Sequence, residues 1–585
     1  MNRSRLRGWI LIWVVALVPM IYGTYLVRHY GVEVPTLDDW EMAPLIVKAH
    51  SGQLTFAEIF AQQQEARTVL PKLIFILSAM SGHWDVRDLM MLSVISCWLT
   101  AAGIFVLLRS SGLSLVAVAL CFWLIVLTIF SLAQCELWIF ASGFPSFLPA
   151  LFLVMALVAL GTLRSTALKF LTCAMLAAAS SFTLANGLLA WGLTFPIFLL
   201  VQRPSRWRSW LALWLGAGAV CAAIYFWGYE RPPYHPPFAP AAPLLEYTRF
   251  FLEFLGGGLA YSFRPHAVIA TFFGALQLAL YLLALVYAAK RIHDRVFLAK
   301  VTPWFALGLY SIGSACLAAL GRVGYGSSYA LASRYVTFSI YLTVAVIALV
   351  ALLGREIVQS HPTGRSRGWV LVTSLILIIA YLVPFRACSA NSHFFLRALS
   401  RKDRLARAAV LFSSALDTTD VIKKTAYPGD AETVVQSAAA LDRLNLIQPP
   451  LLRTNRLSAM PQAVAEPEQV AGSCQTVLPV GDELYRASGW ATLKKEGRPA
   501  DCVVVAYQDS GSQEWIAVAI SDSFEMQPDR AKHFRNLDQL WSRWSATIPR
   551  NAFPPGARLS FWAVNADEPK LYQLSDESSS EGPLR

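Results

Sequence analysis

Stretches of about 20 mainly apolar residues fill the first two-thirds of this 585-residue chain. A stretch of this length crosses a bilayer as a helix, because a helix pairs its backbone N–H and C=O groups internally where no water can reach them. Eleven such stretches are present: 8–27, 88–108, 113–133, 144–163, 170–186, 187–202, 209–228, 267–289, 302–320, 335–354 and 368–385. The sequence therefore predicts an all-α, polytopic membrane domain with about 11 transmembrane helices.

Two of these stretches are less regular than the others. The first is too long for a cleaved signal peptide and is interpreted as a retained anchor. The fifth and sixth meet at Asn186 and Gly187, so they form either two crossings or one re-entrant hairpin. Gly256-Gly257-Gly258 has the composition of a turn.

Charged residues make up 15% of the chain, against roughly 25% in soluble proteins. The apolar residues are concentrated before residue 386, and the remainder has an ordinary soluble composition. We therefore expect a membrane domain at 1–386 with a long outer loop at 28–87, a helical connector at 387–470 and a β-sandwich-like domain at 471–585.

The expected tail combines helices with short strands. Helical patterns occupy 400–416 and 432–447, and alternating β-rich runs follow. These runs are Leu484–Leu493, Asp501–Gln508, Glu514–Ile520 and Leu559–Asn565. Their spacing predicts an α/β tail that contains a small β-sandwich. Cys474 and Cys502 form a disulfide if the tail faces an oxidising compartment and they lie close together; otherwise they remain free thiols.

Basic residues in the short loops predict the orientation. With the N-terminus in the cytoplasm, the inside segments carry sixteen Lys and Arg residues against only Asp294 and Glu356. This surplus accounts for the formal net charge of +12 and leaves no basic surface for nucleic acid. Eleven crossings place the tail outside. We expect a multi-pass protein of the bacterial cytoplasmic membrane with a periplasmic or extracellular C-terminal domain.

An acidic motif opens the first outer loop. Asp38, Asp39 and Glu41 lie within four residues, around Trp40. A carboxylate here can act as a general base towards an acceptor hydroxyl, and Trp40 can offer a flat face to a sugar ring. Alternatively, the acidic residues cap a helix start and Trp40 anchors that helix at the membrane interface.

The same loop carries Glu65, Arg67 and, farther along, Lys72. Basic residues on the outer side depart from the usual bias, so Arg67 and Lys72 are candidates for binding an anion. Their alternative role is to extend towards lipid headgroups.

A second basic cluster lies where the ninth and tenth stretches face the outside. Arg322 closes one stretch, and Ser333-Arg334-Tyr335 opens the next after a loop rich in Gly, Ser and Tyr. Two arginines at membrane depth require an anionic partner, and lipid-linked phosphate suits the bidentate guanidinium group. The alternative is an internal salt bridge to Asp38 or Glu65. Glu136, after the third stretch, can line the same cavity.

Together these motifs resemble the GT-C superfamily of membrane glycosyltransferases. Within it, the chain looks like bacterial proteins that carry an Asp-x-Trp motif and then Glu-His-Arg in the first outer loop. The matching residues here are Asp38-Asp39-Trp40 and Glu65-Ala66-Arg67, so Ala66 replaces the histidine. The resemblance covers roughly residues 1–386.

The resemblance implies transfer of a sugar from a polyprenyl-phosphate donor to a lipid, glycan or protein acceptor. Asp38 would be the base, with Asp39 or Glu41 as alternates. The other implied substrate-binding residues are Trp40, Glu65, Arg67, Lys72, Glu136, Arg322, Arg334 and Tyr335. No cofactor is required in this expectation and no metal site is assigned, although use of a divalent metal stays open.

Three alternatives use the same features. The chain could be a transporter or flippase of lipid-linked saccharides, although its spans carry few mid-depth charges. It could be a ligase or polymerase that acts on a polyprenyl carrier. It could also be a non-catalytic receptor whose tail binds carbohydrate through Trp490, Trp515 or Trp562.

Overall fold

The computed structural model describes residues 3–233, 236, 242–260, 266–360, 364–460, 463–464, 469–533 and 535–576. The chain packs into two compact units. The first contains residues 1–31, 55–74 and 89–396, and the second contains 32–54, 75–88 and 397–585. The outer loop 28–87, expected to lie wholly in the membrane domain, is therefore divided between the two units. A single boundary at residue 386 does not describe this division.

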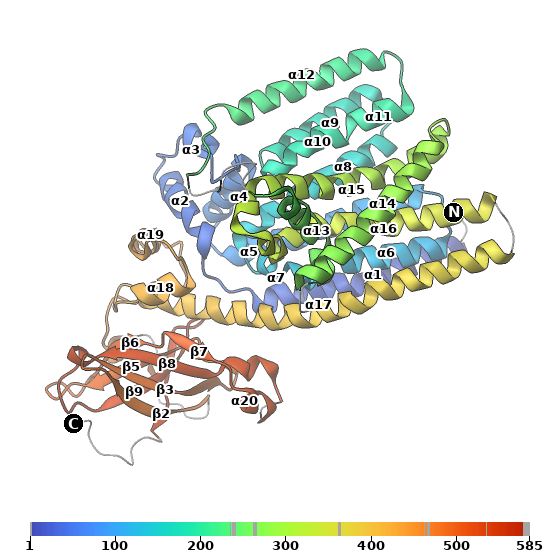
Figure 1. Cartoon of the computed structure of the whole chain (residues 1–585). Helices are drawn as coiled ribbons and strands as arrows, with labels where there is room; N and C mark the ends of the chain where they lie inside the picture. The colour runs from blue at the N-terminus through green and yellow to red at the C-terminus, as the bar shows by residue number, and fades with distance from the viewer. Residues whose placement is uncertain are drawn as a thin grey trace. The chain divides into compact units, whose positions relative to one another are not determined.

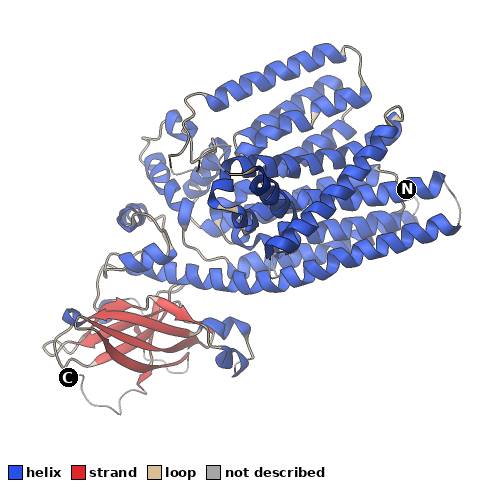
Figure 2. Cartoon of the chain, viewed as in Figure 1, coloured by secondary structure: helices blue, strands red, loops and turns tan. Residues whose placement is uncertain are grey.

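The first unit is built from helices (Figures 1 and 2). Its principal helices are α1 (Arg3–Tyr30), α3 (Phe56–Phe60), α4 (Val69–Met80), α5 (Val86–Ser110), α6 (Leu115–Ile129), α7 (Cys135–Trp138), α8 (Leu148–Thr162), α9 (Thr166–Ser181), α10 (Ala190–Leu193), α11 (Phe195–Gln202), α12 (Trp207–Phe226), α13 (Leu244–Ala260), α14 (His266–Lys290), α15 (Arg295–Arg322), α16 (Ser333–Ser360) and α17 (Gly364–Phe412). The ends of α4, α5 and α17 continue into the second unit.

Among the described residues, ten helical segments are long and apolar enough to cross a membrane. All of the expected stretches correspond to helices; the one at 170–186 becomes α9, which has 16 residues and is too short to be counted. The chain thus has the helices of a multi-pass membrane protein. The count of eleven crossings and their direction remain predictions.

The break at Asn186 and Gly187 is a distinct structural feature. A short 3-10 helix, η4 (Ala185–Leu189), separates α9 from α10. A Cβ on Gly187 would lie 1.9 Å from the Ser180 carbonyl oxygen, so the close approach requires glycine. The Asn186 amide donates to the Tyr310 hydroxyl (3.0 Å) and to Ser314 Oγ (3.3 Å). These contacts satisfy the side-chain N–H groups of Asn186, whereas its Oδ1 is buried without a hydrogen-bond partner among the described residues.

The interpretation of Gly256-Gly257-Gly258 as a turn was wrong, because all three residues lie inside α13. A Cβ on Gly256 would lie 1.9 Å from the Ala270 carbonyl oxygen, and one on Gly274 would lie 2.0 Å from that of Leu252. The glycines therefore allow the backbones of α13 and α14 to touch, as small residues do between membrane helices.

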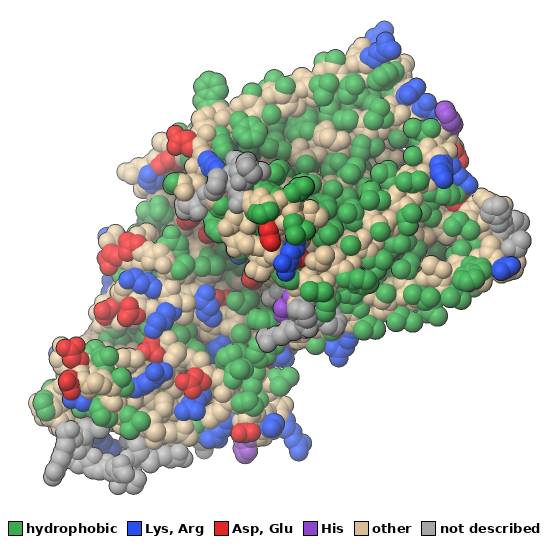
Figure 3. Space-filling model, in the orientation of Figure 1, with side chains coloured by type: hydrophobic (Ala, Val, Ile, Leu, Met, Phe, Trp, Pro, Cys, Tyr) green, Lys and Arg blue, Asp and Glu red, His purple; other side chains and the backbone are tan. Residues whose placement is uncertain are grey.

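Charge is distributed along the helices as a bilayer requires. On the face drawn in Figure 3, hydrophobic side chains cover the broad middle of the helical part, and Lys and Arg side chains gather at helix ends. Apolar side chains are exposed on these helices, including Val18 on α1, Leu215 on α12 and Leu371 on α17. Lipid can cover these side chains without the cost of exposing them to water.

The second unit contains α2 (Ala43–His50), α18 (Thr419–Thr425), α19 (Ala431–Arg443) and two β-sheets. The strands are β1 (Ala463–Val464), β2 (Val470–Val480), β3 (Leu484–Leu493), β4 (Arg498–Pro499), β5 (Cys502–Gln508), β6 (Trp515–Ile520), β7 (Ser523–Glu525), β8 (Arg543–Pro549), β9 (Leu559–Asn565), β10 (Lys570–Gln573) and β11 (Ser575–Asp576). One sheet has the order β1-β10-β9-β5-β6; the other has β11-β2-β3-β8-β7, with β4 beside β3.

Both sheets contribute to one apolar core. Ala487 and Trp544 come from one sheet, and Val503, Val505 and Phe561 come from the other. The four β-rich runs expected from the sequence are the strands β3, β5, β6 and β9, within one residue at their ends. The β-rich runs therefore identified four strands of the sandwich, whereas β2 and β8, which contribute Cys474 and Trp544 to the core, were not among them.

Cys474 and Cys502 are buried free thiols, so the disulfide alternative does not hold in this structure. Cys474 lies on β2 and Cys502 on β5, which belong to different sheets. Cys474 belongs to the core between the sheets, whereas Cys502 precedes the core residue Val503 on β5 and so points to the opposite face of its strand.

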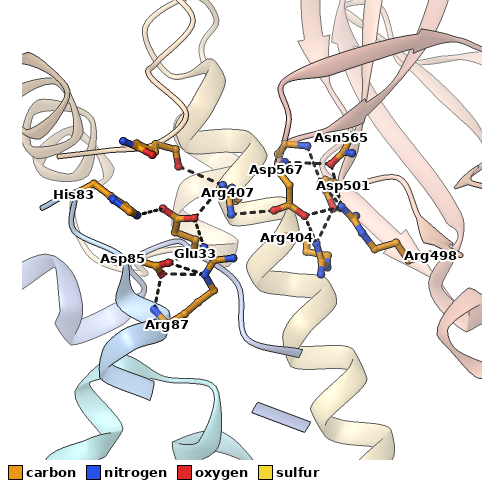
Figure 4. A network of polar contacts seen from close by, with 12 residues as sticks. Glu33, His83, Asp85, Arg87, Arg404, Arg407, Arg498, Asp501, Asn565 and Asp567 are labelled. Carbon is orange, nitrogen blue, oxygen red and sulfur yellow. Dashed lines mark hydrogen bonds and ion pairs between the residues drawn. The ribbon is translucent and has the colours of Figure 1, made fainter. Parts of the chain in front are cut away.

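Within the second unit, an ion-pair network joins α17 to the sandwich (Figure 4). Asp501, which is 1% exposed, pairs with Arg498 and lies 3.6 Å from Arg404 Nη1. The Ala566 amide donates to Asp501 Oδ2 at 2.7 Å. Because the carboxylate is almost completely enclosed, these partners are needed to offset its lost hydration.

Asp567 extends the network along α17. It pairs with Arg404 (3.3 Å), Arg407 (3.0 Å) and Arg498 (2.9 Å). Burial alone would raise the pKa of Asp567, but the three guanidinium groups outweigh it and hold that pKa below its usual value. Arg407 also approaches Glu33 at 3.5 Å, which links α17 to the start of the first loop.

We predict that Asp501→Asn destabilises the second unit by about 3 kcal/mol, because Asp567 alone must then neutralise both Arg404 and Arg498 in a largely enclosed network. Glu568→Gln is the matched control: it removes a more exposed pair with Lys570 and should cost under about 1 kcal/mol. Limited proteolysis of the purified chain against urea concentration measures both. Equal midpoints for the two variants would contradict the role given to Asp501.

Candidate functional site

The strongest candidate site surrounds the junction between α15 and α16. After Arg322 ends α15, two short 3-10 helices follow, η5 (Val323–Tyr325) and η6 (Ser327–Leu331), and then α16 begins. Gly326 joins them with a φ of +96°, a conformation that favours glycine. This turn brings arginines and tyrosines together. We call Glu65, Glu136, Arg322, Tyr325, Tyr329, Arg334 and Tyr335 the arginine–tyrosine cluster.

Arg334 is the most accessible arginine of the cluster, with 44% of its side chain exposed. Its Nη2 donates to the Tyr329 hydroxyl at 2.6 Å, and its guanidinium carbon lies 5.1 Å from the centre of that ring. Glu136, 39% exposed, approaches it at 3.9 Å, which is long for a salt bridge. The guanidinium group is thus held by an aromatic side chain and only loosely by a carboxylate.

Arg322 has a tighter arrangement. It pairs directly with Glu65, so the internal salt bridge expected as the alternative role of Arg322 is present. Burial raises the pKa of Tyr229, nearby Glu65 raises it further, and Arg231 and Arg322 partly offset this effect. The Arg322–Glu65 pair carries no net charge, but its two charges shift the pKa of Tyr229 in opposite directions.

Tyrosines connect the two arginines. Tyr329 and Tyr335 lie within electrostatic range of both Arg322 and Arg334. The Tyr329 and Tyr335 ring centres are 5.9 Å apart, and that of Phe254 on α13 lies 5.4 Å from that of Tyr335. Arg322, Arg334 and Tyr335 therefore lie together, with Glu65 and Glu136 beside them.

Ser333 is a buried residue that sequence reasoning quoted but did not assign. Its hydroxyl donates to the Ala133 carbonyl at 2.7 Å and accepts from the Glu136 amide at 3.3 Å. These bonds fasten α7 to the start of α16 and place Glu136 beside Arg334. The only signal in the sequence was a serine at a helix start, which ordinarily indicates a cap.

Arg67 and Lys72, two of the four expected anion ligands, are bound to backbone carbonyls instead. Arg67 donates to the carbonyls of Phe60, Tyr225 and Trp227, and is 4% exposed. Lys72 Nζ donates to the carbonyls of Glu58 (3.2 Å) and Ala61 (2.6 Å). Both cations meet carbonyls at helix ends, where the helix dipole is negative.

The acidic motif belongs to the second unit and forms a 3-10 turn, η1 (Leu37–Met42). Asp39 is fully buried, and its Oδ2 accepts from the Thr36 amide at 3.1 Å, so it caps the turn. Trp40 is only 3% exposed and presents no open ring face. The capping alternative therefore describes Asp39, and Trp40 packs in the interior.

Asp38 and Glu41 remain candidates for the base. Burial raises the pKa of Tyr427, and the charges of Glu41, Asp38 and Asp430 raise it further, which places this tyrosine beside the turn. Asp403 on α17 lies within electrostatic range of Asp39. Sequence reasoning missed Asp403 because one acidic residue in a mixed helical pattern gives no distinguishing signal.

One set of side chains in the described part of the chain has the composition of a metal site. Ligand atoms of Glu33, His83 and Asp85 lie within 4.8 Å of one another (Figure 4). However, Arg87 Nη2 pairs with Glu33 at 2.7 Å and with Asp85 at 2.6 Å. A cation would have to displace a guanidinium group that already neutralises both carboxylates, so the arrangement fits an ion-pair network better.

Comparisons with known proteins give no match to a family model, to a curated protein or to a solved structure.

We predict that Arg67 and Arg334 have different roles. Arg67→Met removes donors from three backbone carbonyls and should destabilise the first unit by about 3 kcal/mol. Arg334→Met removes a half-exposed cation of the same size and should cost under about 1 kcal/mol. Thermal unfolding of detergent-purified protein measures both changes. A larger loss for Arg334→Met would make Arg334 a structural residue.

Proposed function

We propose that the chain is a GT-C-like glycosyltransferase that takes a sugar from a polyprenyl-phosphate donor on the outer face of a bacterial cytoplasmic membrane. The observation that carries the proposal is Arg334. Its guanidinium group is half-exposed, stacked beside Tyr329 and only loosely paired with Glu136. Such a cation at the end of a membrane helix suits a phosphate headgroup.

The membrane helices offer apolar volume away from the cluster. An apolar cavity of about 140 Å³ lies among α6, α14, α16 and α17. Thr343 lines it and follows Arg334 by nine positions, roughly 14 Å along a helix. Nine residues make about two and a half helical turns, so the cavity lies on the side of α16 opposite Arg334. What supports a lipid-linked donor is therefore the position of Arg334 at the end of a membrane helix.

The proposed transfer moves the sugar from the phosphate to the acceptor and leaves negative charge on the phosphate. The bond between the sugar C1 and the phosphate oxygen breaks, the acceptor oxygen bonds to C1, and the acceptor proton passes to a base. Negative charge builds on the leaving phosphate, where Arg334, with Arg322 behind it, would stabilise it. Asp38 is the first candidate for the base, with Glu41 as the alternate; Asp39 is already engaged as a cap.

A lipid-saccharide flippase would use the same phosphate-binding residues. Gln277 at mid-span is engaged within the protein: it accepts from Thr343 and donates to the Leu255 and Phe273 carbonyls. Other buried polar atoms, among them Asn186 Oδ1 and Thr337 Oγ1, have no hydrogen-bond partner among the described residues. The products of the reaction separate the two proposals.

The test is turnover of synthetic polyprenyl-phosphate hexoses and pentoses by the purified chain, offered with membrane lipid, glycan and protein acceptors. Release of free polyprenyl phosphate is measured. Arg334→Gln and Asp38→Asn should each lower kcat/KM roughly 100-fold or more. Lys290→Gln, at the end of another span, should leave it unchanged.

Each failure has a separate meaning. Full turnover by Asp38→Asn would remove Asp38 as the base, and full turnover by Arg334→Gln would remove the proposed phosphate site. If no donor is consumed but the labelled lipid changes leaflet in proteoliposomes, the transferase proposal fails and the flippase replaces it. Release of polyprenyl diphosphate from a diphosphate donor would identify a ligase or polymerase.

A further inference from the structure

Four hydroxyl side chains form a row across neighbouring strands of one sheet of the sandwich. In the sheet that contains β2, β3, β8 and β7, Thr476 is paired with Ser488, Ser488 with Ser545, and Ser545 with Ser523. The Thr476 and Ser488 oxygens are 2.7 Å apart, and those of Ser523 and Ser545 are 2.6 Å apart. We call these four residues the hydroxyl row.

The hydroxyl row lies on the face of the sheet turned away from the core. Side chains alternate between the faces of a strand. Ala487 on β3 and Trp544 and Ala546 on β8 belong to the core, so their neighbours Ser488 and Ser545 point the other way. With about 4.8 Å between strands, the row extends roughly 14 Å.

Longer side chains flank the row on both sides. On one side, Trp490 is paired with Arg543, and Arg543 with Glu525. On the other side, Arg486 is paired with Thr547, and its Nη2 reaches back to donate to Ser545 Oγ at 3.2 Å. A guanidinium group therefore lies against the middle of the row.

A third arginine completes this face. Arg530, on the short helix α20 (Pro528–His533), stacks with its guanidinium carbon 3.8 Å from the centre of the Trp490 ring. The face thus carries Arg486, Arg530 and Arg543, against Glu525, which lies 3.4 Å from Arg543. Asp522 at the edge is held by Ser523 Oγ and by the Thr547 amide. The three arginines outnumber these two carboxylates, so the net charge of the named groups on this face is positive.

The hydroxyl row, Trp490 and the three arginines offer three different kinds of contact to a ligand. Paired hydroxyls alone can stabilise strand pairing. An aromatic ring, planar cations and small hydroxyls together provide stacking, anion binding and both donors and acceptors for sugar hydroxyl groups. Three arginines are too few for a polyanion tract such as nucleic acid, which needs many phosphate contacts.

We propose that this face of the sandwich binds an acidic oligosaccharide, with its carboxylate or phosphate at Arg486 and its sugar hydroxyls at Thr476, Ser488 and Ser523. Ser545, 2% exposed, lies beneath Arg486 and supports the row from within. The proposal is independent of the glycosyltransferase proposal, since it uses none of the residues assigned to the transfer reaction. It gives the tail a role in holding a glycan.

The test is isothermal titration of the full chain in nanodiscs with oligogalacturonate and with phosphorylated mannan oligosaccharides. Maltooligosaccharide of equal length is the neutral probe, and polyglutamate is the acidic probe without sugar. Arg486→Gln should weaken binding of the acidic oligosaccharide about tenfold or more. Ser488→Val, which keeps the charge, should also weaken it. Arg550→Gln, at a guanidinium that stacks on Tyr485, should not.

Several outcomes would overturn the proposal. These are failure of both acidic oligosaccharides to bind, equal affinity for polyglutamate, or unchanged affinity in Arg486→Gln and Ser488→Val. Stronger binding of the maltooligosaccharide would replace the acidic ligand with a neutral one. Proteolysis midpoints of the variants, compared with wild type, separate loss of the face from loss of folding.

Discussion

The structure depends most on the cost of placing charge where water is scarce. Charges that cannot reach water must be neutralised by partners on the chain or by a ligand. Arg67 and Lys72 meet helix-end carbonyls, Arg322 meets Glu65, and Asp501 meets two arginines. Arg334 is the exception in the arginine–tyrosine cluster, since its carboxylate partner lies 3.9 Å away. A loosely paired arginine beside well-paired ones is what makes this position a candidate for binding an anion.

Composition and periodicity predicted the elements of this fold well. Apolar stretches became helices, and alternating runs became β3, β5, β6 and β9, because both depend on burial patterns written locally in the sequence. The placement of Gly256–Gly258 inside α13 was not predictable in this way. There, glycine serves contact with α14, a partner that local composition does not reveal.

The candidate site was predicted only in part. Two arginines at helix ends signal an anion partner, so Arg322 and Arg334 could be found from sequence. The distinction between Arg67, which holds carbonyls, and Arg334, which remains accessible, depends on tertiary contacts. The same holds for Asp39 as a cap and for Ser333 as the residue that places Glu136. The state of the two tail cysteines likewise required the structure, because Cys474 belongs to the core between the sheets and Cys502 does not.

The central claim is that Arg334 binds a lipid-linked phosphate in competition with Glu136. Binding of farnesyl phosphate to the chain in nanodiscs tests it most directly, by comparing wild type with Arg334→Gln and Glu136→Gln. The account predicts binding about tenfold weaker or more in Arg334→Gln and tighter in Glu136→Gln, since the second change removes the competing carboxylate. Equal affinity in wild type and Arg334→Gln would contradict it.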